Sequence, residues 1–302
     1  MIWRWYIGKV PLLLAFWMGV TALAFVIGRI APPRPQVYIL SWQAGDPLSI
    51  MILDVDLNVS IRFEPEPALP GSAVGDWALS PDGSHFVMKN AYDLMVMDNR
   101  GRHQRWLTQD GTNNHAPAWS PDGTKIAFVS ERDNNSEIYV MDADGSNQVR
   151  LTQNDVYDSS PSWSPDGKHI AFESFEGDSD SEIYVMDSDG NNPHPLTSND
   201  DYDSSPAWSP DGQHILFTSN RANAAYQLYV MNADGSDPHV LVSIEGGHIL
   251  PARAWSPDGH FIMFQEVVIN MGRMFVANAD GSHLRPLPNW KPPMVTPLWF
   301  TP

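Results

Sequence analysis

Short apolar runs alternate with polar turns along most of the chain. Residues 126–129 and 215–217 are typical runs, and each is followed by a second one, as at 138–141. Runs of this length, rich in Ile, Val, Phe and Tyr and bounded by turn residues, predict β-strands rather than helices. We therefore expect an all-β protein built from short antiparallel strands.

The strands recur in a repeat that two turn motifs mark. The pentapeptide WSPDG occupies residues 119–123, 163–167, 208–212 and 255–259, and a related LSPDG occupies 79–83. A second motif, Asp-x-Asp-Gly or Asn-Ala-Asp-Gly, follows the second apolar run of each unit, at 142–145, 187–190, 232–235 and 278–281. Pro presets φ, Asp accepts local hydrogen bonds and Gly tolerates positive φ, so both motifs predict tight turns. Each unit then contains four antiparallel strands.

The spacing of the units predicts a β-propeller. The positions equivalent to the motif tryptophan are Leu79, Trp119, Trp163, Trp208, Trp255 and Trp299, separated by 40, 44, 45, 47 and 44 residues. Four strands at this period are the signature of propeller blades. Residues 37–63 supply only three strands, and the last unit ends after its first strand. We therefore expect residues 297–299 to pair with 37–40, which closes a six-bladed propeller over residues 37–302.

The repeat W-S-P-D-G…I-A-F…I-Y-V-M-D-x-D-G…L-T resembles the TolB-type, WD40-like propeller repeat over roughly residues 37–302. TolB is a periplasmic protein whose propeller docks envelope proteins, so the resemblance implies a non-catalytic binding or scaffold module of the cell envelope. Two features depart from it. TolB has an α/β domain before its propeller, whereas in this chain a Pro-rich spacer leads directly into the strands. TolB is also released after export, whereas this chain is expected to stay anchored.

That N-terminal part predicts a membrane anchor. Residues 10–28 are 19 consecutive residues without a charge, enough for roughly 28 Å of helix, about the thickness of a bilayer core. We expect a basic segment at 1–9, a transmembrane signal-anchor helix at 10–28 and a Pro-rich spacer at 29–36. The propeller would then lie outside the cytoplasm, in the periplasm or outside the cell. The alternative is a signal peptide cleaved after Ala24.

Charge and missing motifs exclude several functions. The chain has 36 Asp and Glu against 18 Lys and Arg, a net charge of −18, which argues against a nucleic-acid partner. No cysteine is present, and no G-x-S-x-G, Walker A or H-E-x-x-H motif occurs, so we assign no catalytic residue. The alternative to a binding module is a metal-assisted lyase, lactonase or hydrolase at an acidic channel mouth, and a purely structural spacer is a third hypothesis.

The candidate site lies on the face opposite the two turn motifs, where the loops between blades are acidic. The expected contacts to an envelope protein or glycan are Asp155, Tyr157, Asp158, Asp200, Asp201, Tyr202 and Asp203. The residues His115, Asp158, Asp203 and His248 precede successive motif tryptophans by 4, 5, 5 and 7 residues, so they could converge on a divalent cation. The alternative is that the aspartates cap loop backbones and the histidines are solvated. No other cofactor is expected.

Overall fold

The fold is taken from a computed structural model, which describes residues 36–41, 49–53, 59–63, 74–175, 180–221, 226–244, 248–250, 255–268, 271–287 and 298–300. The chain divides into two units, residues 1–34 and 35–302, and all described residues belong to the second. The expected segments 1–9 and 10–28, and all but the last residue of 29–36, lie outside the described residues. Within the described part of the chain, no helix has the length and apolar character needed to cross a bilayer.

Five consecutive stretches of chain each fold into a four-stranded antiparallel sheet, which we name blades I to V. Blade I contains β4 (Val74–Leu79), β5 (His85–Asn90), β6 (Asp93–Asp98) and β7 (Arg105–Trp106). Blade II contains β8 (Asn114–Trp119), β9 (Lys125–Ser130), β10 (Glu137–Asp142) and β11 (Val149–Arg150). Blade III contains β12 (Asp158–Trp163), β13 (His169–Phe175), β14 (Ser181–Asp187) and β15 (His194–Pro195). Blade IV contains β16 (Asp203–Trp208), β17 (His214–Ser219), β18 (Gln227–Asn232) and β19 (His239–Val242). Blade V contains β20 (His248–Leu250), β21 (Phe261–Val268), β22 (Met271–Asn278) and β23 (Arg285–Pro286).

A further four-stranded sheet, the terminal sheet, joins distant parts of the chain. It contains β1 (Gln36–Ser41), β2 (Ser49–Leu53) and β3 (Val59–Phe63), and β24 (Leu298–Phe300) pairs with β1. Val37 lies opposite Trp299 in this antiparallel register. The expected pairing of the C-terminal strand with the first strand is therefore confirmed.

The expected fold class nevertheless needs correction. We predicted six blades preceded by one transmembrane helix, but the described chain folds as five blades, each made from one continuous segment with its own Ser-Pro-Asp-Gly turn. No Ser-Pro-Asp-Gly sequence occurs in residues 36–63, and the terminal sheet is described by its backbone pairing alone. No membrane-spanning helix is found among the described residues. The sixth blade that we expected corresponds to the terminal sheet, which is assembled from both ends of the chain and is not one of the five blades.

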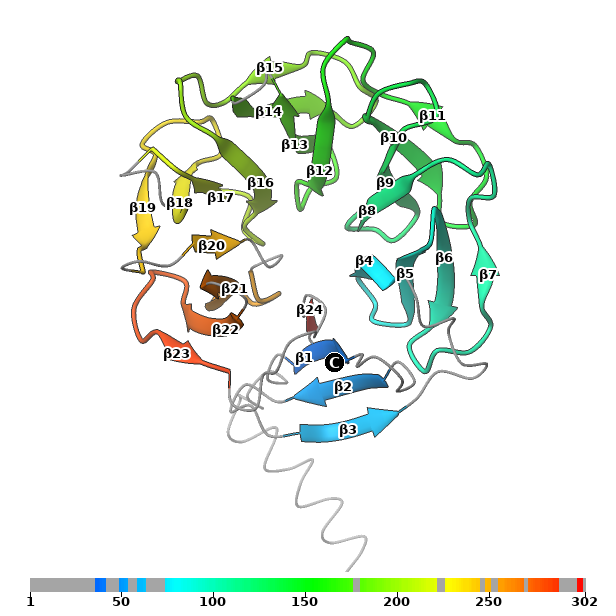
Figure 1. Cartoon of the computed structure of the whole chain (residues 1–302), viewed down its shortest axis with the longest axis horizontal. Helices are drawn as coiled ribbons and strands as arrows, with labels where there is room; N and C mark the ends of the chain where they lie inside the picture. Colours follow the sequence, from blue (N-terminus) through cyan, green and yellow to red (C-terminus); the bar gives the residue numbers. More distant parts are fainter. Residues whose placement is uncertain are drawn as a thin grey trace, which may run out of the picture. The chain divides into compact units, whose positions relative to one another are not determined.

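The blades follow one another in chain order, and the first strand of each lies innermost (Figure 1). The outermost strands β7, β11, β15, β19 and β23 form the periphery of this arrangement. The Ser-Pro-Asp-Gly and Asp-x-Asp-Gly turns lie at one end of the strands, which we call the turn face. The connections between the second and third strands, and between consecutive blades, lie at the other end, which we call the loop face.

The Ser-Pro-Asp-Gly turn is held by its own side chains. In blade II the Ser120 hydroxyl donates to Asp122 Oδ1 at 2.6 Å and accepts from the Lys125 N–H at 2.9 Å. The Gly123 N–H donates to the Ser120 carbonyl at 2.9 Å. The hydroxyl of Ser120, followed by the Thr124 N–H, lowers the pKa of Asp122. These aspartates are turn residues, so they carry no information about a partner.

Apolar side chains from neighbouring blades form the core between them. Val87 and Val96 of blade I pack in one cluster with Phe128 and Tyr139 of blade II. Phe128 is completely buried, a contribution of roughly 1.5–3 kcal/mol relative to an exposed side chain. The indole N–H of Trp163 donates to the Ala118 carbonyl of the preceding blade at 3.2 Å. The motif tryptophans thus pack at the blade interfaces.

The glycine of each Asp-x-Asp-Gly turn also serves the blade interface. Gly145 has φ +88°, and a Cβ at this position would lie 2.9 Å from the carbonyl oxygen of Leu107 in blade I. Gly190 and Gly235 approach Leu151 and Leu196 of their preceding blades in the same way. The absent side chain therefore allows two backbones from neighbouring blades to come into contact.

Substituting this glycine should destabilise the propeller more than substituting the other turn glycine. Gly145→Ala combines positive φ with a backbone clash, whereas Gly123→Ala has the same kind of φ (+71°) and its nearest atom is 3.7 Å away. We expect Gly123→Ala to cost about 1–2 kcal/mol of unfolding free energy and Gly145→Ala at least about 1 kcal/mol more. Urea unfolding of both variants measures the difference, and equal losses would contradict the close contact between blades.

Candidate functional site

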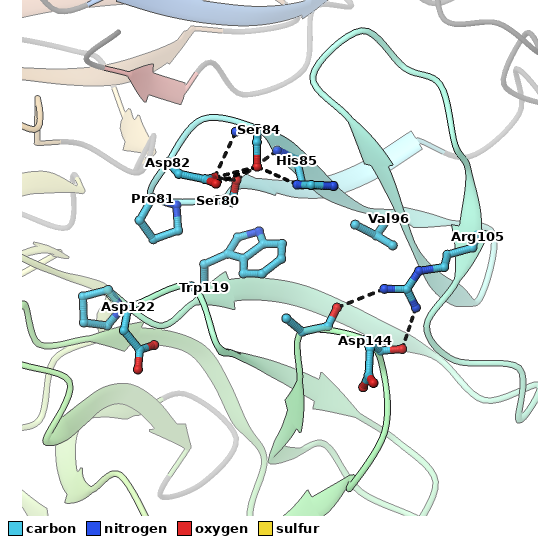
Figure 2. Close-up of a pocket in the computed structure, with 13 residues that line it drawn as sticks. Ser80, Pro81, Asp82, Ser84, His85, Val96, Arg105, Trp119, Asp122 and Asp144 are labelled. Atoms are coloured by element: carbon cyan, nitrogen blue, oxygen red, sulfur yellow. Dashed lines mark hydrogen bonds between the residues drawn. The ribbon is translucent and has the colours of Figure 1, made fainter.

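The turn face contains a pocket at each of three successive blade interfaces. The pocket between blades I and II has a volume of about 620 Å³ and is lined by Asp82, Trp119 and Asp144, with Arg105 at its edge (Figure 2). Arg105 donates to the carbonyl oxygens of Ala143 and Asp144 across the interface. Pockets of about 470 and 520 Å³ lie at the next two interfaces, lined by the same motif positions. Because the pockets repeat with the motif, they follow from the packing of the blades, and none of them is indicated as a specific binding site.

The loop face of blades III and IV holds the predicted partner-binding residues, but at different depths. Asp155, Tyr157 and Asp200 are exposed, and Asp201 and Tyr202 are half-buried. Asp158 and Asp203 are completely buried, because each is the first residue of an innermost strand. Only the first five are therefore placed where a protein surface can contact them directly.

Aromatic side chains form a continuous row on this face. The ring of Tyr157 lies edge-on to Phe175 at 6.5 Å, Phe175 to Tyr202 at 5.8 Å, and Tyr202 to Tyr226 at 5.7 Å. Edge-to-face geometry is favourable for aromatic pairs. Tyr157 and Tyr202 were predicted from the sequence, whereas Phe175 and Tyr226 were not. Phe175 is the last residue of β13 in blade III, and Tyr226 directly precedes β18 in blade IV, so both lie at the loop-face ends of central strands and contact Tyr202.

A buried glutamate lies beneath this row. The Tyr202 hydroxyl donates to Glu173 Oε1 at 2.9 Å, and the Ser205 N–H donates to its Oε2 at 3.3 Å. Burial raises the pKa of Glu173, and the hydrogen bond from Tyr202 opposes that effect. Glu173 was not predicted from the sequence, although a charged residue directly after the apolar run 170–172 is the signal that points to it. It fixes Tyr202 in place.

The two buried aspartates have different surroundings. Asp203 Oδ2 forms an ion pair with Nη2 of Arg221 at 2.5 Å and accepts from the Asn199 amide at 2.9 Å. Asp158 Oδ2 accepts from the Asn154 amide at 2.8 Å, and no described arginine or lysine forms an ion pair with it. Burial raises the pKa of Asp158. Asp203 therefore has an arginine as its counter-ion, whereas Asp158, at the equivalent position of blade III, forms no ion pair with a described arginine or lysine.

The third strands contribute two further buried carboxylates, Glu137 and Glu182. Glu137 accepts from Nη2 of Arg150 at 2.6 Å. Glu182 accepts from the backbone N–H of Asn199 and from its side-chain amide instead. Burial raises the pKa of Glu182 to about 7, and the negative charge of Asp203 adds to the effect.

The four predicted metal ligands are placed as follows. His115 lies 4.0 Å from a carboxylate oxygen of Asp76 and 3.9 Å from one of Glu131. Asp158 and Asp203 are buried in the environments described above, and the side chain of His248 lies outside the described residues. Among the side chains that are described, no group of three or more His, Asp or Glu is arranged to hold a metal ion. The divalent cation therefore stays a prediction.

The family follows from the sequence match to these blades. The model of the TolB β-propeller domain matches residues 68–177 and 156–297, which together span all five blades. The chain belongs to the TolB β-propeller family. TolB from Acinetobacter baumannii has a similar structure, with a TM-score of 0.70 and 22% identity over 88% of this chain and 66% of that one. At this identity the likeness shows the fold alone.

Proteins with other functions share the fold. A chain of the nidogen/laminin complex superposes with a TM-score of 0.67 and 10% identity, covering 88% of this chain and 98% of that one. An oligogalacturonate lyase from Vibrio parahaemolyticus superposes with a TM-score of 0.57 and 14% identity, covering 83% and 78%. Dipeptidyl-peptidase 5 from Porphyromonas gingivalis is 30% identical over 91 residues, only 13% of its length. This chain therefore matches a small part of that curated relative.

Removing the counter-ion of Asp203 should be costly. Arg221→Ala leaves a fully buried carboxylate without its cation, and we expect a loss of about 3 kcal/mol in unfolding free energy. The control is Arg102→Ala, whose ion pair with Asp98 is half-exposed and should contribute less than about 1 kcal/mol. Urea denaturation of both variants gives the comparison, and similar losses would show that burial adds nothing to the Arg221 pair.

Glu182 should make stability depend on pH. Its pKa is raised above the ordinary value, so between about pH 4.5 and pH 7 the folded state binds more protons than the unfolded one. The stabilisation from the neutral form is present below this range and is lost as the pH rises through 7. Gln227 occupies the equivalent position in blade IV, so Glu182→Gln should fit. We expect its melting temperature to exceed that of the native chain by more at pH 8 than at pH 5. A pH-independent difference would argue against the raised pKa.

Proposed function

We propose that this chain is a non-catalytic binding module of the cell envelope, which captures a partner protein on the loop face of blades III and IV. The contact surface comprises Asp155, Tyr157, Asp200, Asp201 and Tyr202. We further propose that residues 10–28 tether the propeller to the membrane and that it faces the periplasm or the cell exterior.

The observation that carries this proposal is the aromatic row with carboxylates around it. Tyr157 is 57% exposed, which makes it the most exposed aromatic side chain of this row among the described residues. Exposed tyrosines supply large contact area with little loss of side-chain entropy, which is why they are enriched at protein interfaces. Asp155 and Asp200 are exposed and lie two residues before Tyr157 and Tyr202 of the row. No lysine or arginine occurs in residues 153–158 or 198–203.

The likeness to known proteins supports a binding role. The chain shares its fold with TolB and with a protein found in complex with laminin. The acidic character of the loop face indicates a partner with a basic surface, because complementary charge accelerates encounter and disfavours wrong partners. The charge-free segment at residues 10–28 supports the proposed tether.

The test is capture by the full-length chain in its native membrane. Affinity-tagged protein is cross-linked in intact cells, and the attached proteins are quantified by mass spectrometry. The triple variant Asp155→Asn, Asp200→Asn and Asp201→Asn should reduce the specific partner about tenfold, and Tyr157→Ser should act in the same direction. Capture by the native chain should also weaken as ionic strength rises.

A charge change on the turn face provides the control. Asp237 is exposed and lies in the last turn of blade IV, so Asp237→Asn should leave capture unchanged. If the triple variant captures the same proteins as the native chain, the loop face is not the contact surface. If the Asp237→Asn control loses capture together with the triple variant, the loss follows from the change in net charge, and the loop face is not shown to be the contact surface.

A further inference from the structure

The last turn of blade I, residues 98–106, differs in charge from the corresponding turn of the other four blades. We call it the basic turn, because three of the fourteen lysines and arginines in residues 36–302 fall within 100–105. Residues 36–302 otherwise carry all 36 acidic side chains of the chain, so the basic turn stands out on an acidic body. Arg100 takes the place of an aspartate that the other blades share, at Asp144, Asp189, Asp234 and Asp280.

The local fold does not require an arginine at this position. In blade II the Asp144 carboxylate accepts the Ser146 N–H at 2.9 Å and the Ser146 hydroxyl at 2.5 Å, which stabilises the turn. Arg100 cannot accept such a bond, so blade I lacks this interaction. The basic turn is held instead by Asp98, whose Oδ1 accepts the N–H groups of Arg100 at 2.9 Å and Arg102 at 2.8 Å. The arginine therefore indicates a role outside the turn.

The arginines of the basic turn are open to solvent. Arg100 is exposed, and its side chain forms no ion pair or hydrogen bond with any described residue. Arg102 pairs with Asp98 but remains 52% exposed. Arg105 is exposed and donates to two carbonyl oxygens of blade II, which fix its guanidinium beside the turn (Figure 2). The three charges are thus presented together on one surface.

An exposed tryptophan follows these charges directly. Trp106 is the second residue of β7, the outermost strand of blade I, and is 41% exposed. It is the only exposed tryptophan among those whose side chains are described. Indole rings favour the headgroup region of a membrane, and arginine forms bidentate hydrogen bonds to phosphate. Arginines beside an exposed tryptophan are therefore suited to a surface of anionic phospholipids.

The chain enters the described fold on the same face. In blade II, Trp119 at the turn-face end of the first strand lies opposite Ile126, the second residue of the second strand. Trp299 lies opposite Val37, the second residue of β1, in the same register. The start of β1 therefore corresponds to the turn face. The terminal sheet also lies beside blade I, where β24 contacts β4 (Figure 1).

Only a short spacer separates this entry point from the proposed tether. Seven residues, 29–35, connect the charge-free segment 10–28 to Gln36, and the fully extended chain spans at most about 28 Å there. If residues 10–28 cross the membrane, the start of β1 and the neighbouring basic turn are held near its surface. Tethering raises the effective concentration of the surface, so contacts that are weak by themselves suffice to orient the protein.

We propose that the basic turn docks on anionic phospholipid headgroups of the membrane that holds the chain, with Arg100 and Arg102 at the phosphates and Trp106 among the headgroups. The inference rests on the proposed tether, and it adds an orientation to the proposed function. The turn face lies toward the membrane, and the loop face with its capture surface points away from it. An anionic membrane repels the acidic remainder of the body, so the basic turn determines which side approaches.

The heights of two labelled sites above the membrane test this orientation. Because the chain has no cysteine, His103→Cys on the basic turn or Asp155→Cys on the loop face introduces a single site for a fluorophore. The full-length chain is reconstituted in vesicles of phosphatidylcholine with about 30% phosphatidylglycerol, and energy transfer to a headgroup-attached acceptor is measured. We expect stronger transfer from residue 103 than from residue 155. The difference should shrink in phosphatidylcholine alone and when the salt is raised to about 0.5 M.

Charge reversal at residue 100 identifies the contact. Arg100→Asp introduces the aspartate of the other blades, so this variant should fold. It should lower the ratio of docked to undocked chains about twentyfold, because each basic residue near an anionic surface contributes about fivefold and the new charge is repelled. The matched control is Lys168→Asp, the same charge change at an exposed turn-face position of blade III, which should lower the ratio less than about twofold. Trp106→Val, which introduces the residue found at Val240 of blade IV, should also weaken docking.

Equal transfer from residues 103 and 155, or transfer from residue 103 that Arg100→Asp leaves unchanged, would overturn the inference. Transfer between labelled chains that Arg100→Asp abolishes would assign the basic turn to a second copy of the chain, and it would overturn lipid docking as well.

Alkaline carbonate extraction of the vesicles separates this result from the proposed function. Release of the chain by carbonate would contradict the tether, and transfer from residue 103 would still decide the docking. A chain that stays inserted while residue 103 lies as far from the headgroups as residue 155 would contradict this inference alone. Loss of partner capture with unchanged transfer would contradict the proposed capture surface alone.

Discussion

The apolar side chains of the two central strands in each blade can be removed from water only by a neighbouring blade. A single four-stranded sheet has no interior, so Phe128 is fully buried only because blades I and II pack on each other. The remaining local features serve this packing. The Ser-Pro-Asp-Gly turn sets the register of the first hairpin, and the glycine of the second turn lets the next blade come into contact.

The same packing explains why carboxylates are concentrated where the blades meet. The start of each first strand and the start of the third strand of the preceding blade lie together on the loop face. Asn199 connects them, since it donates both to Glu182 of blade III and to Asp203 of blade IV. At this interface Arg221 forms an ion pair with Asp203, and Glu182, which forms no ion pair with a described arginine, has a raised pKa. The loop face therefore has acidic side chains buried between the blades as well as acidic side chains exposed on its surface.

The fold could be predicted from the sequence to the extent that local signals determine it. The turn motifs, the strands and the pairing of Leu298–Phe300 with the first strand all follow from short segments whose chemistry is specific. The number of blades was predicted wrongly, because the strands at the two ends of the chain look like parts of a sixth blade in the sequence but form the terminal sheet. Burial was also hard to infer. Asp158 and Asp203 stand in acidic loops by sequence, yet each begins an innermost strand and is covered by its neighbours. Glu173 and Tyr226 were missed because their roles depend on a neighbouring blade, which a single repeat does not reveal.

The pairing of β24 with β1 has a consequence for how the chain folds. The two strands come from opposite ends of the described sequence, so this contact can form only after all five blades have been synthesised. The entropic cost of joining such distant segments is large for an unfolded chain and small once the blades between them are packed. Completion of the terminal sheet therefore belongs to the last stage of folding. Until then the edge of β1 offers its backbone donors and acceptors to any other strand, which makes this the step at which a chaperone or a second chain would compete.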